Sequence, residues 1–479
     1  MDYRQGKVLA NEINKKPLML VLISGAFVAV LNQTILTTAL PDIMKDLNLD
    51  ASVAQWLQSI FLLVNGIMIP ITAFLIERFT TRGLFLTAMG LLAIGTLIGS
   101  VSPNFAFLLL GRILQAAGAG IIMPLMQTIV FLVFPLEKRG TAMGLFGLVI
   151  AFAPAIGPTL SGWLVDHFDW RSLFYILLPF ILSNLIVAFF ILKNVTIQKF
   201  SKIDILSIVY STLGFGGILY AFSTAGGSGW SSVQVIVSML VGAACLALFI
   251  VRQVKIDHPI LRFSVFNYRV FTVTTILGMI VFLSLIGGSV ILPIYMQNML
   301  KFTAFESGLI LLPGAIVMGI MSPVTGRLFD KFGARWLSII GLIILVITTF
   351  MLSNLTQNTT FIYLAVVNAI RMFAVSMVLM PVTTAGLNEL PPELIAHGTA
   401  MNNTMRQVAG AVGTAVLVTV MTNYSVPAAG VSGLIRGVNV SFVFAGIIAS
   451  IGLLLSFLIK AKQPKVESFK VTSLANENK

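Results

Sequence analysis

Long runs of apolar residues dominate the pattern of hydrophobic and polar positions along the chain. Each run is about 20 residues long, the length a helix needs to cross a hydrocarbon core of about 30 Å. The alternation typical of membrane barrel strands does not occur in the sequence. The pattern predicts an all-α membrane protein with spans at residues 18–40, 53–75, 84–101, 105–133, 141–164, 172–192, 205–224, 233–252, 271–295, 305–325, 336–354, 361–386, 398–422 and 438–460.

Composition agrees with this pattern and excludes several classes of function. The 479 residues are 57% hydrophobic and 10% charged, whereas a soluble domain has about 25% charged residues. The single cysteine, Cys245, lies in an apolar run, which rules out an intrachain disulfide or a cysteine-ligated metal site. The sequence has no phosphate-binding loop of the form G-x-x-x-x-G-K-[ST]. We therefore expect no cofactor and no metal, and no ATP-driven activity from this chain.

Basic residues define the expected topology. An even number of spans puts both ends of the chain on one side. Of the 30 Lys and Arg residues, 23 fall on the side of the termini, and only Lys45, Arg171, Lys301 and Arg436 fall on the opposite side. This asymmetry predicts cytoplasmic termini. The polar, basic start "MDYRQGKVLANEINKKP" leads into a long span without a small-residue cleavage site, which predicts that the start is not cleaved. The asymmetry also explains the net charge of +13. We therefore expect the basic residues to bind anionic lipid headgroups rather than nucleic acid.

Two loops indicate an internal repeat. The stretches "AFLIERFTTR" (73–82) and "GRLFDKFGAR" (326–335) align without gaps, and each half carries an arginine ahead of a proline, at Arg112 and Arg371. Duplicated halves with a binding site at their interface are a recurring transporter design. The predicted organisation is a cytoplasmic N-terminus (1–17), a six-helix bundle (18–192), a linker with two inserted helices (193–270), a second six-helix bundle (271–460) and a cytoplasmic tail (461–479).

Four further stretches carry a family resemblance: "LNQTILTTALP" (31–41), "GRILQAAGAGIIMP" (111–124), "GLVIAFAPAIGPTLSG" (147–162) and "RQVAGAVG" (406–413). With the loop repeat, they make residues 18–460 resemble the fourteen-span drug:proton antiporters of the major facilitator superfamily, similar to bacterial lincomycin- and multidrug-resistance exporters. The resemblance implies a fourteen-helix major facilitator fold (6+2+6) in a bacterial plasma membrane. It also implies export of amphipathic drugs or antibiotics in exchange for protons by alternating access, and no enzymatic activity.

Other functions are compatible with the same sequence. The first alternative is a dedicated exporter or flippase of a lipid-like or siderophore-like metabolite. The second, from another class, is a transport-dead membrane sensor or assembly partner, and the repeated loop motif argues against it. For an exporter, the expected partners are small amphipathic drugs, protons and membrane lipids, and we expect a monomer.

The loop motif and the fifth span provide the candidate gate. Acids in the loops can cap a neighbouring helix or bind basic residues when the inner side is closed, and release them when it opens. Simple anchoring by positive charge is the alternative for the basic residues. The first copy has Ala73 and Glu77 where the family has glycine and aspartate, which predicts a looser contact. The candidate gating residues are Glu77, Arg78, Arg82, Asp330, Lys331 and Arg335 in the loops, and Gly147, Pro154, Gly157 and Pro158 in a kinked fifth span.

Arg112, Arg371 and Arg406 are charges inside spans, and such residues are functional hypotheses by default. The depth of Arg112 in its span matches that of Asn32, so Arg112 is expected to contact Asn32, Gln33 or Gln115. Arg112 then either takes part in transport or holds the first and fourth spans together. The same two alternatives apply to Arg371 and Arg406, with local partners Asn402, Asn403 and Gln407.

Proton coupling is harder to place, because none of the 17 Asp and Glu residues lies at the middle of a predicted span. Related exporters often carry an acid where this chain has Asn32 and Gln33, and amides do not titrate. We therefore expect a carboxylate nearer the outer surface, first Glu306, with a pKa raised by partial burial; the alternative is a solvated residue at a helix start. The remaining coupling candidates are Asp42, Asp166 and Asp169, with Arg112; His167, His258 and His397 are not expected to lie deep enough.

The drug site is expected to be an apolar cavity with a few polar groups. The 21 methionines and 35 phenylalanines suit adaptable packing against varied ligands, although most of them must face lipid or pack between helices. The candidate lining residues are Asn32, Gln33, Gln115, Met123, Gln127, Phe152, Phe282, Asn403 and Gln407.

Overall fold

A computed structural model describes residues 14–196, 198, 204–257 and 259–459. The ends of the predicted cytoplasmic segments (1–13 and 460–479) and His258 lie outside the described residues. Fourteen helices in the described part are long and apolar enough to cross a membrane, and it contains no strand. The predicted all-α fold with fourteen spans is confirmed.

The helices fall into three groups along the chain. The first half contains α2 (Lys15–Ile35), α5 (Trp56–Arg78), α6 (Thr81–Ser100), α7 (Phe105–Val133), α8 (Arg139–His167) and α9 (Ser172–Ile191). The inserted pair is α10 (Ile205–Ser228) and α11 (Val233–Lys255). The second half contains α12 (Arg269–Ile294), α13 (Ala304–Phe332), α14 (Ala334–Met351), α15 (Phe361–Asn388), α16 (Ile395–Tyr424) and α17 (Gly430–Ser456). Short elements join them: α3 (Leu40–Asp46), α4 (Ala51–Ala54), η1 (Leu136–Lys138), η2 (Phe263–Asn267), η3 (Tyr295–Met299), η4 (Pro392–Leu394) and η5 (Pro427–Ala429).

Three helix boundaries differ from the sequence prediction for identifiable reasons. The first span ends at Ile35, and Pro41 stands in the first turn of the separate helix α3, a position that suits proline. α13 continues through the loop motif and ends at Gly333, whose φ of +77° favours glycine. α17 begins at Gly430 rather than at residue 438, because Arg436 lowers the hydropathy of its first turns.

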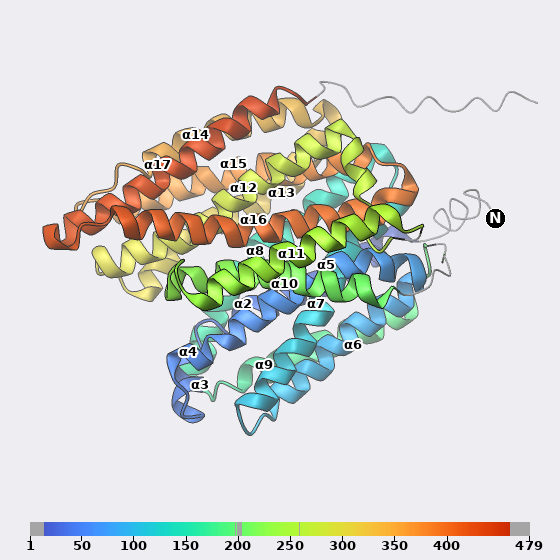
Figure 1. The fold of residues 1–479 in the computed structure, drawn as a ribbon, viewed down its shortest axis with the longest axis horizontal. Coiled ribbons are helices and arrows are strands. Elements are labelled where there is room, and N and C mark those ends of the chain that lie inside the picture. The colour runs from blue at the N-terminus through green and yellow to red at the C-terminus, as the bar shows by residue number, and fades with distance from the viewer. Residues whose placement is uncertain (1–13, 197, 199–203, 258, 460–479) are drawn as a thin grey trace, which may run out of the picture.

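The packing of the helices repeats between the two halves. In the first half α2 packs on α8, α5 on α7, and α6 on α7 and α9; in the second half α12 packs on α16, α13 on α15, and α14 on α15 and α17. These are equivalent pairs when α2–α9 are matched to α12–α17, which supports the predicted duplication. Across the interface, α8 packs on α13 and α5 on α16, again an equivalent pair. The halves lie side by side in Figure 1, the first in blue to teal and the second in yellow to red.

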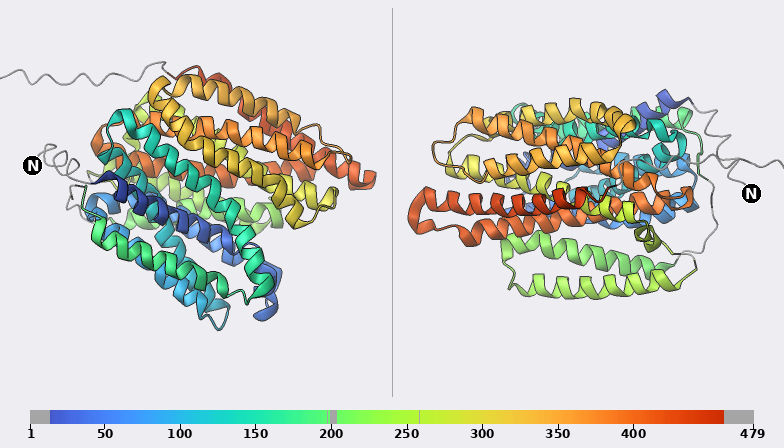
Figure 2. Two further views of the ribbon diagram at one scale, coloured as in Figure 1. Left: turned by 180° about the vertical axis from the view of Figure 1, so that it is seen from behind. Right: turned by 90° about the horizontal axis from the view of Figure 1, so that it is seen from above.

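The inserted helices form a separate layer on one face, seen at the bottom of the right-hand view in Figure 2. α10 contacts both α5 and α16, so it covers the line where the halves meet. Arg252 of α11 forms a two-bond ion pair with Asp204 at the start of α10, with N–O distances of 2.7 and 2.9 Å. The hydrogen bond from Arg252 lowers the pKa of Asp204 to about 2. This ion pair joins the two inserted helices at one end.

Candidate functional site

The two halves are joined on the side where α2 begins and α17 ends, which we call the terminal side. Gln127 of α7 accepts a hydrogen bond of 2.7 Å from Asn403 of α16, and the hydroxyls of Thr128 and Thr399 lie 2.8 Å apart. These residues lie in the last turns of α7 and the first turns of α16. We call these contacts, together with those of Asp330 and His397 described next, the terminal-side closure.

Asp330 of the second half caps a helix of the first half. Its carboxylate accepts hydrogen bonds of 2.8 Å from the backbone N–H groups of Gly140 and Thr141, and one of 2.6 Å from the Thr141 hydroxyl. The residue that precedes α8, Lys138, provides no side-chain cap of its own. A carboxylate at a helix N-terminus satisfies free N–H groups and complements the helix dipole. Of the two predicted modes for the loop acid, Asp330 uses helix capping.

Close packing of α8 on α13 continues this contact, as the view from behind in Figure 2 illustrates. A Cβ atom added to Gly144 would lie 2.6 Å from the carbonyl oxygen of Ser322, and one added to Gly147 would lie 2.8 Å from the Ser322 side chain. Gly147 therefore lies at the interface between the halves, where the fifth span was expected to pack. Near the other end of α8, Gly157 packs against Thr34 of α2 inside the first half.

Both prolines of α8 lie away from the interface contacts, and the helix continues across them. Pro154 is exposed, and the carbonyl of Pro158 accepts a hydrogen bond of 3.4 Å from Thr38, also in the first half. An interior proline frees the carbonyl four residues before it, here those of Ile150 and Pro154, so the bond from Thr38 is additional to this effect.

Glu77, the loop acid of the first half, contacts the side chain of His397 near the start of α16. Glu77 Oε1 lies 3.2 Å from His397 Nε2, and the backbone N–H of Arg262 donates a hydrogen bond of 3.4 Å to His397 Nδ1. The ring of His397 is completely buried. Sequence reasoning passed over this histidine because it compared only depth in the membrane. A signal was present: "HGTAM" (397–401) repeats "RGTAM" (139–143) at the start of the equivalent helix.

The basic residues of the loop motif mostly face aromatic rings or solvent. The guanidinium of Arg78 lies 5.9 Å from the ring of Phe74, and that of Arg82 lies 4.5 Å from the ring of Phe189 on α9. Both rings belong to the first half, so these cation–π contacts hold that half together. In the second copy, Arg327 and Lys331 are exposed and Arg335 is half-buried.

Arg112 is the centre of a buried network inside the first half. Its guanidinium donates to the carbonyl of Leu57, to the backbone and side-chain oxygens of Asn32, and to Gln115, with distances of 3.0–3.1 Å. It also lies 4.3 Å from the ring of Phe61. Arg112 is 1% exposed, and Asn32 and Gln115 are fully buried. The predicted contacts with Asn32 and Gln115 are present, and they join α2, α5 and α7.

The second half contains two further buried arginines. Arg371 donates to the backbone oxygen of Ser284 and, at 3.1 Å, to its hydroxyl. Arg406 lies 5.9 Å from the ring of Phe282 on α12, and its Nε and Nη2 atoms are buried without a hydrogen-bond partner among the described residues. Neutral oxygens and rings are the contacts of these guanidinium groups, which leaves the interior positively charged.

The predicted substrate residues separate into two groups. Asn32 and Gln115 belong to the Arg112 network, about 18 Å along α7 from Gln127. Gln127 and Asn403 contact each other between the halves. The remaining candidates are half-buried: Gln33, Met123, Phe152, Phe282 and Gln407.

Two of these half-buried residues lie where helices of different halves meet. Phe152 of α8 contacts Gly319 of α13, and a Cβ atom added to Gly66 of α5 would lie 3.6 Å from the Gln407 side chain of α16. Among the predicted lining residues, Gln127, Phe152, Asn403 and Gln407 therefore have the strongest claim to a site between the halves.

Glu306, the first choice for proton coupling, caps its own helix. Its carboxylate accepts hydrogen bonds of 2.8 and 3.0 Å from the backbone and hydroxyl of Thr303, and Thr303 Oγ1 accepts one of 3.1 Å from the Glu306 N–H. This reciprocal pair is a capping box. The partial burial expected for Glu306 is wrong, because the residue is exposed. The alternative, a solvated residue at a helix start, describes the structure.

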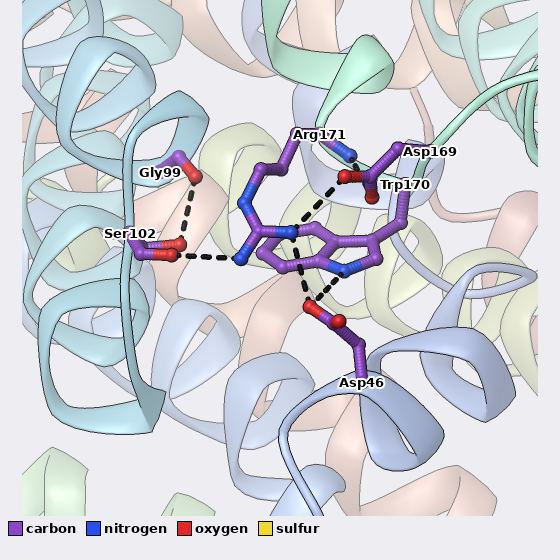
Figure 3. A network of polar contacts seen from close by, with 6 residues as sticks. All are labelled: Asp46, Gly99, Ser102, Asp169, Trp170 and Arg171. Atoms are coloured by element: carbon purple, nitrogen blue, oxygen red, sulfur yellow. Dashed lines mark hydrogen bonds and ion pairs between the residues drawn. The ribbon is translucent and has the colours of Figure 1, made fainter.

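The other acidic candidates lie at the end of the molecule opposite to the terminal side. Figure 3 shows Asp169 and Asp46 on either side of Arg171, with N–O distances of 3.1 and 3.0 Å. Hydrogen bonds from Trp170 and Arg171 hold the pKa of Asp46 below its usual value. Arg171 also donates to the carbonyl of Ser102 at 3.0 Å, so the cluster joins three loops of the first half. The remaining two acids, Asp42 and Asp166, are exposed.

Comparisons with known proteins agree with this architecture. Residues 22–414 match the family model described as Major Facilitator Superfamily. The chain is 54% identical to the uncharacterised MFS-type transporter YcnB of Bacillus subtilis, covering 95% of this chain and 97% of that one. It is 44% identical to the lincomycin resistance protein LmrB of Listeria monocytogenes, covering 94% and 98%. The multidrug export protein EmrB of Escherichia coli is 29% identical, with 83% and 78% covered.

A solved structure gives the same fold. The human organic anion transporter MFSD10 superposes with a TM-score of 0.67 at 15% identity, covering 93% of this chain and all of that one. Together with the fourteen apolar helices and the repeated packing of the two halves, these matches identify a multi-pass membrane protein. The chain belongs to the major facilitator superfamily, and it is a transporter related to lincomycin-resistance and multidrug exporters.

Proposed function

We propose that this protein exports amphipathic drugs or antibiotics in exchange for protons by alternating access. The terminal-side closure is the observation that carries the proposal. Each half contributes its loop acid to the start of a helix in the other half, Asp330 to α8 and Glu77 to α16. Contacts of this kind can be made in one conformation and broken in the other, which is what a gate between two rigid bundles requires.

The orientation follows from charge. Basic residues are concentrated on the terminal side, and the positive-inside rule makes this side cytoplasmic. The conformation described here is then closed toward the cytoplasm. A drug would enter after the closure opens and would leave on the opposite side after it reforms.

The interior favours amphipathic substrates of neutral or negative charge. Arg112, Arg371 and Arg406 are buried, and their contacts are with neutral groups or aromatic rings. A cationic drug between the halves would meet uncompensated positive charge in a medium of low dielectric constant. The half-buried side chains of Phe152, Phe282 and Met123 would supply adaptable apolar contacts.

The test is transport by protein reconstituted into vesicles with an imposed pH gradient. We expect a lipophilic dye to move against its gradient, and a protonophore to abolish this movement. Asp330→Asn should slow transport because a neutral amide caps α8 less well than a carboxylate, whereas Asp42→Asn, at an exposed site, should transport normally. Uphill transport in the absence of any ion gradient would refute the proposed mechanism.

A further inference from the structure

His397 has an unusual position among the ionisable residues of this protein. It is fully buried at the terminal-side closure and links three separate parts of the chain. It belongs to α16 of the second half, its Nε2 meets Glu77 of the first half, and its Nδ1 meets the backbone of Arg262 in the segment after the inserted helices. A change in its protonation therefore acts on all three parts at once.

The hydrogen bonds define the protonation state of His397 in this conformation. Because the Arg262 N–H points at Nδ1, that nitrogen must offer a lone pair. The ring is then neutral, and its single proton is on Nε2, where it is donated to the Glu77 carboxylate. A second proton would have to bind Nδ1, and the resulting N–H would face the Arg262 N–H. Protonation of His397 therefore breaks its bond to the segment between α11 and α12.

The same segment is tied to the inserted helices. The backbone N–H of Leu261, next to Arg262, donates a hydrogen bond of 3.1 Å to Gln253 of α11. Gln253 in turn donates to Ser207 of α10. Residues 261 and 262 thus connect the inserted pair to α16, and His397 is the titratable end of this connection.

The internal repeat gives an independent argument. In "RGTAM" the first residue is Arg139, which donates to Asn388 across the interface at 2.9 Å and to the carbonyls of Phe131 and Phe134. Arginine keeps its charge at every physiological pH. In "HGTAM" the equivalent residue is His397, and histidine is the type of side chain that can gain or lose a charge in the physiological pH range. Of two equivalent positions at the gate, one is permanently charged and the other is titratable.

The surroundings of His397 leave Glu77 as the carboxylate in direct contact, within the described part of the chain. Glu77 is itself largely buried, with 15% of its side chain exposed. The other charged side chains on elements that pack around the start of α16 are Arg78 (α5), Asp204 (paired with Arg252 at α10), Arg262, Arg269 (α12), Glu389 (α15) and Glu393 (η4).

We propose that His397 is the proton-binding group of the terminal-side closure, where opening of the closure releases its proton, a role that rests on the proposed antiport function. In the closed conformation a proton from the opposite side binds Nδ1, and no covalent bond other than the new N–H changes. On α16, Thr399 and Asn403 follow His397 within two turns and form hydrogen bonds to α7. The contact with Arg262 is lost, and the contact with Glu77 becomes an attraction between opposite charges across the two halves. When the closure opens, this attraction is broken and the proton leaves to the terminal side. His397 would then be the titrating group of this transporter, a role that the amides Asn32 and Gln33 of the first span cannot fill.

The first experiment measures the closure directly. In a Cys245→Ser background, Lys138→Cys and Lys331→Cys place spin labels on exposed terminal-side positions of the two halves. Pulsed EPR then gives the ratio of open to closed molecules in detergent. We expect this ratio to fall as the pH falls from 8 to 5, because protonated His397 and Glu77 attract each other across the closure. The change should be at most about tenfold per pH unit for one proton. His397→Gln, which retains one donor and one acceptor, should remove the pH dependence.

His167 provides the matched control, since it is an exposed histidine of α8 at the opposite end of the molecule. His167→Gln should keep the pH dependence of the unsubstituted protein. A pH dependence that survives in His397→Gln, or one that disappears in His167→Gln, overturns the proposal. The proposal is also overturned if the ratio of open to closed molecules does not change with pH in the unsubstituted protein.

Two further measurements separate this inference from the proposed function and from misfolding. Reconstituted His397→Gln should release about one proton fewer per transporter on addition of a transported dye. If the parent protein transports the dye with a proton gradient and His397→Gln still releases the full number of protons, the role of His397 is overturned and antiport is left intact. If transport needs no proton gradient, the proposed antiport is overturned instead. In the unsubstituted protein, nitrogen NMR at pH 8 should show the Nε2–H form of His397, and the Nδ1–H form or the imidazolium would contradict the proposal.

Discussion

Replacement of Gly144 by alanine should open the terminal-side closure. The added Cβ atom would lie 2.6 Å from the carbonyl oxygen of Ser322 and 2.9 Å from Cα of Pro323, whereas ordinary contacts begin at 3.4 Å. Both neighbours are backbone atoms of α13, so no side chain can rotate away. The two helices must separate by several tenths of an ångström, and overpacking of this kind costs about 1–3 kcal/mol.

The cost applies to the closed conformation, where α8 and α13 touch. A free-energy difference of about 1.4 kcal/mol changes an equilibrium tenfold, so the ratio of open to closed molecules should rise by about 5-fold to 150-fold. The spin-label pair at Lys138→Cys and Lys331→Cys reports this ratio. Thermal unfolding of the same samples establishes whether the variant is folded.

Gly162 of the same helix provides the matched control. A Cβ atom there meets no atom within 4 Å, so Gly162→Ala makes the same change in helix propensity without the clash. It should leave the open-to-closed ratio unchanged. Equal ratios in Gly144→Ala and Gly162→Ala would refute the idea that close packing of α8 on α13 maintains the closure.

Three further predictions concern single side chains. Arg112→Ala should nearly abolish transport at matched expression and Arg112→Lys should retain part of it, because lysine lacks the planar fork that reaches Leu57, Asn32 and Gln115; full transport by the alanine variant would exclude a role for the network. Glu306→Ala should lower the free energy of unfolding by about 1 kcal/mol, because the capping box is lost. Dye-induced proton release should stay normal, and loss of this release would restore Glu306 as a coupling residue. Asp204→Asn should lower the melting temperature at pH 7. Because the folded pKa of Asp204, about 2, lies below the ordinary value of 3.8, its stabilisation is present above about pH 4 and is lost as the pH falls toward 2. A difference in melting temperature between variant and parent that persists at pH 2 would contradict the ion-pair explanation.

The sequence by itself determined the membrane fold and its internal repeat. Hydrocarbon of fixed thickness requires apolar helices of a minimum length, so length and hydropathy are sufficient to count the spans. The two loop motifs revealed the duplication because they repeat a pattern of charge and aromatic residues. Contacts within one depth of the membrane were also predictable, as in Arg112 with Asn32 and Gln115, since helices of one bundle cross the membrane in register.

Tertiary structure decided which charged residues meet across the interface. The sequence ranked acids by depth and favoured Glu306, but the structure places it in an exposed capping box. Sequence reasoning passed over His397, which lies near the start of α16. This residue is nevertheless fully buried, because α5 and the segment after α11 cover it. The depth of a residue in the membrane follows from its position along one helix. Its burial and its contacts depend on how separate helices pack, and the sequence of one span does not specify which helices lie next to it.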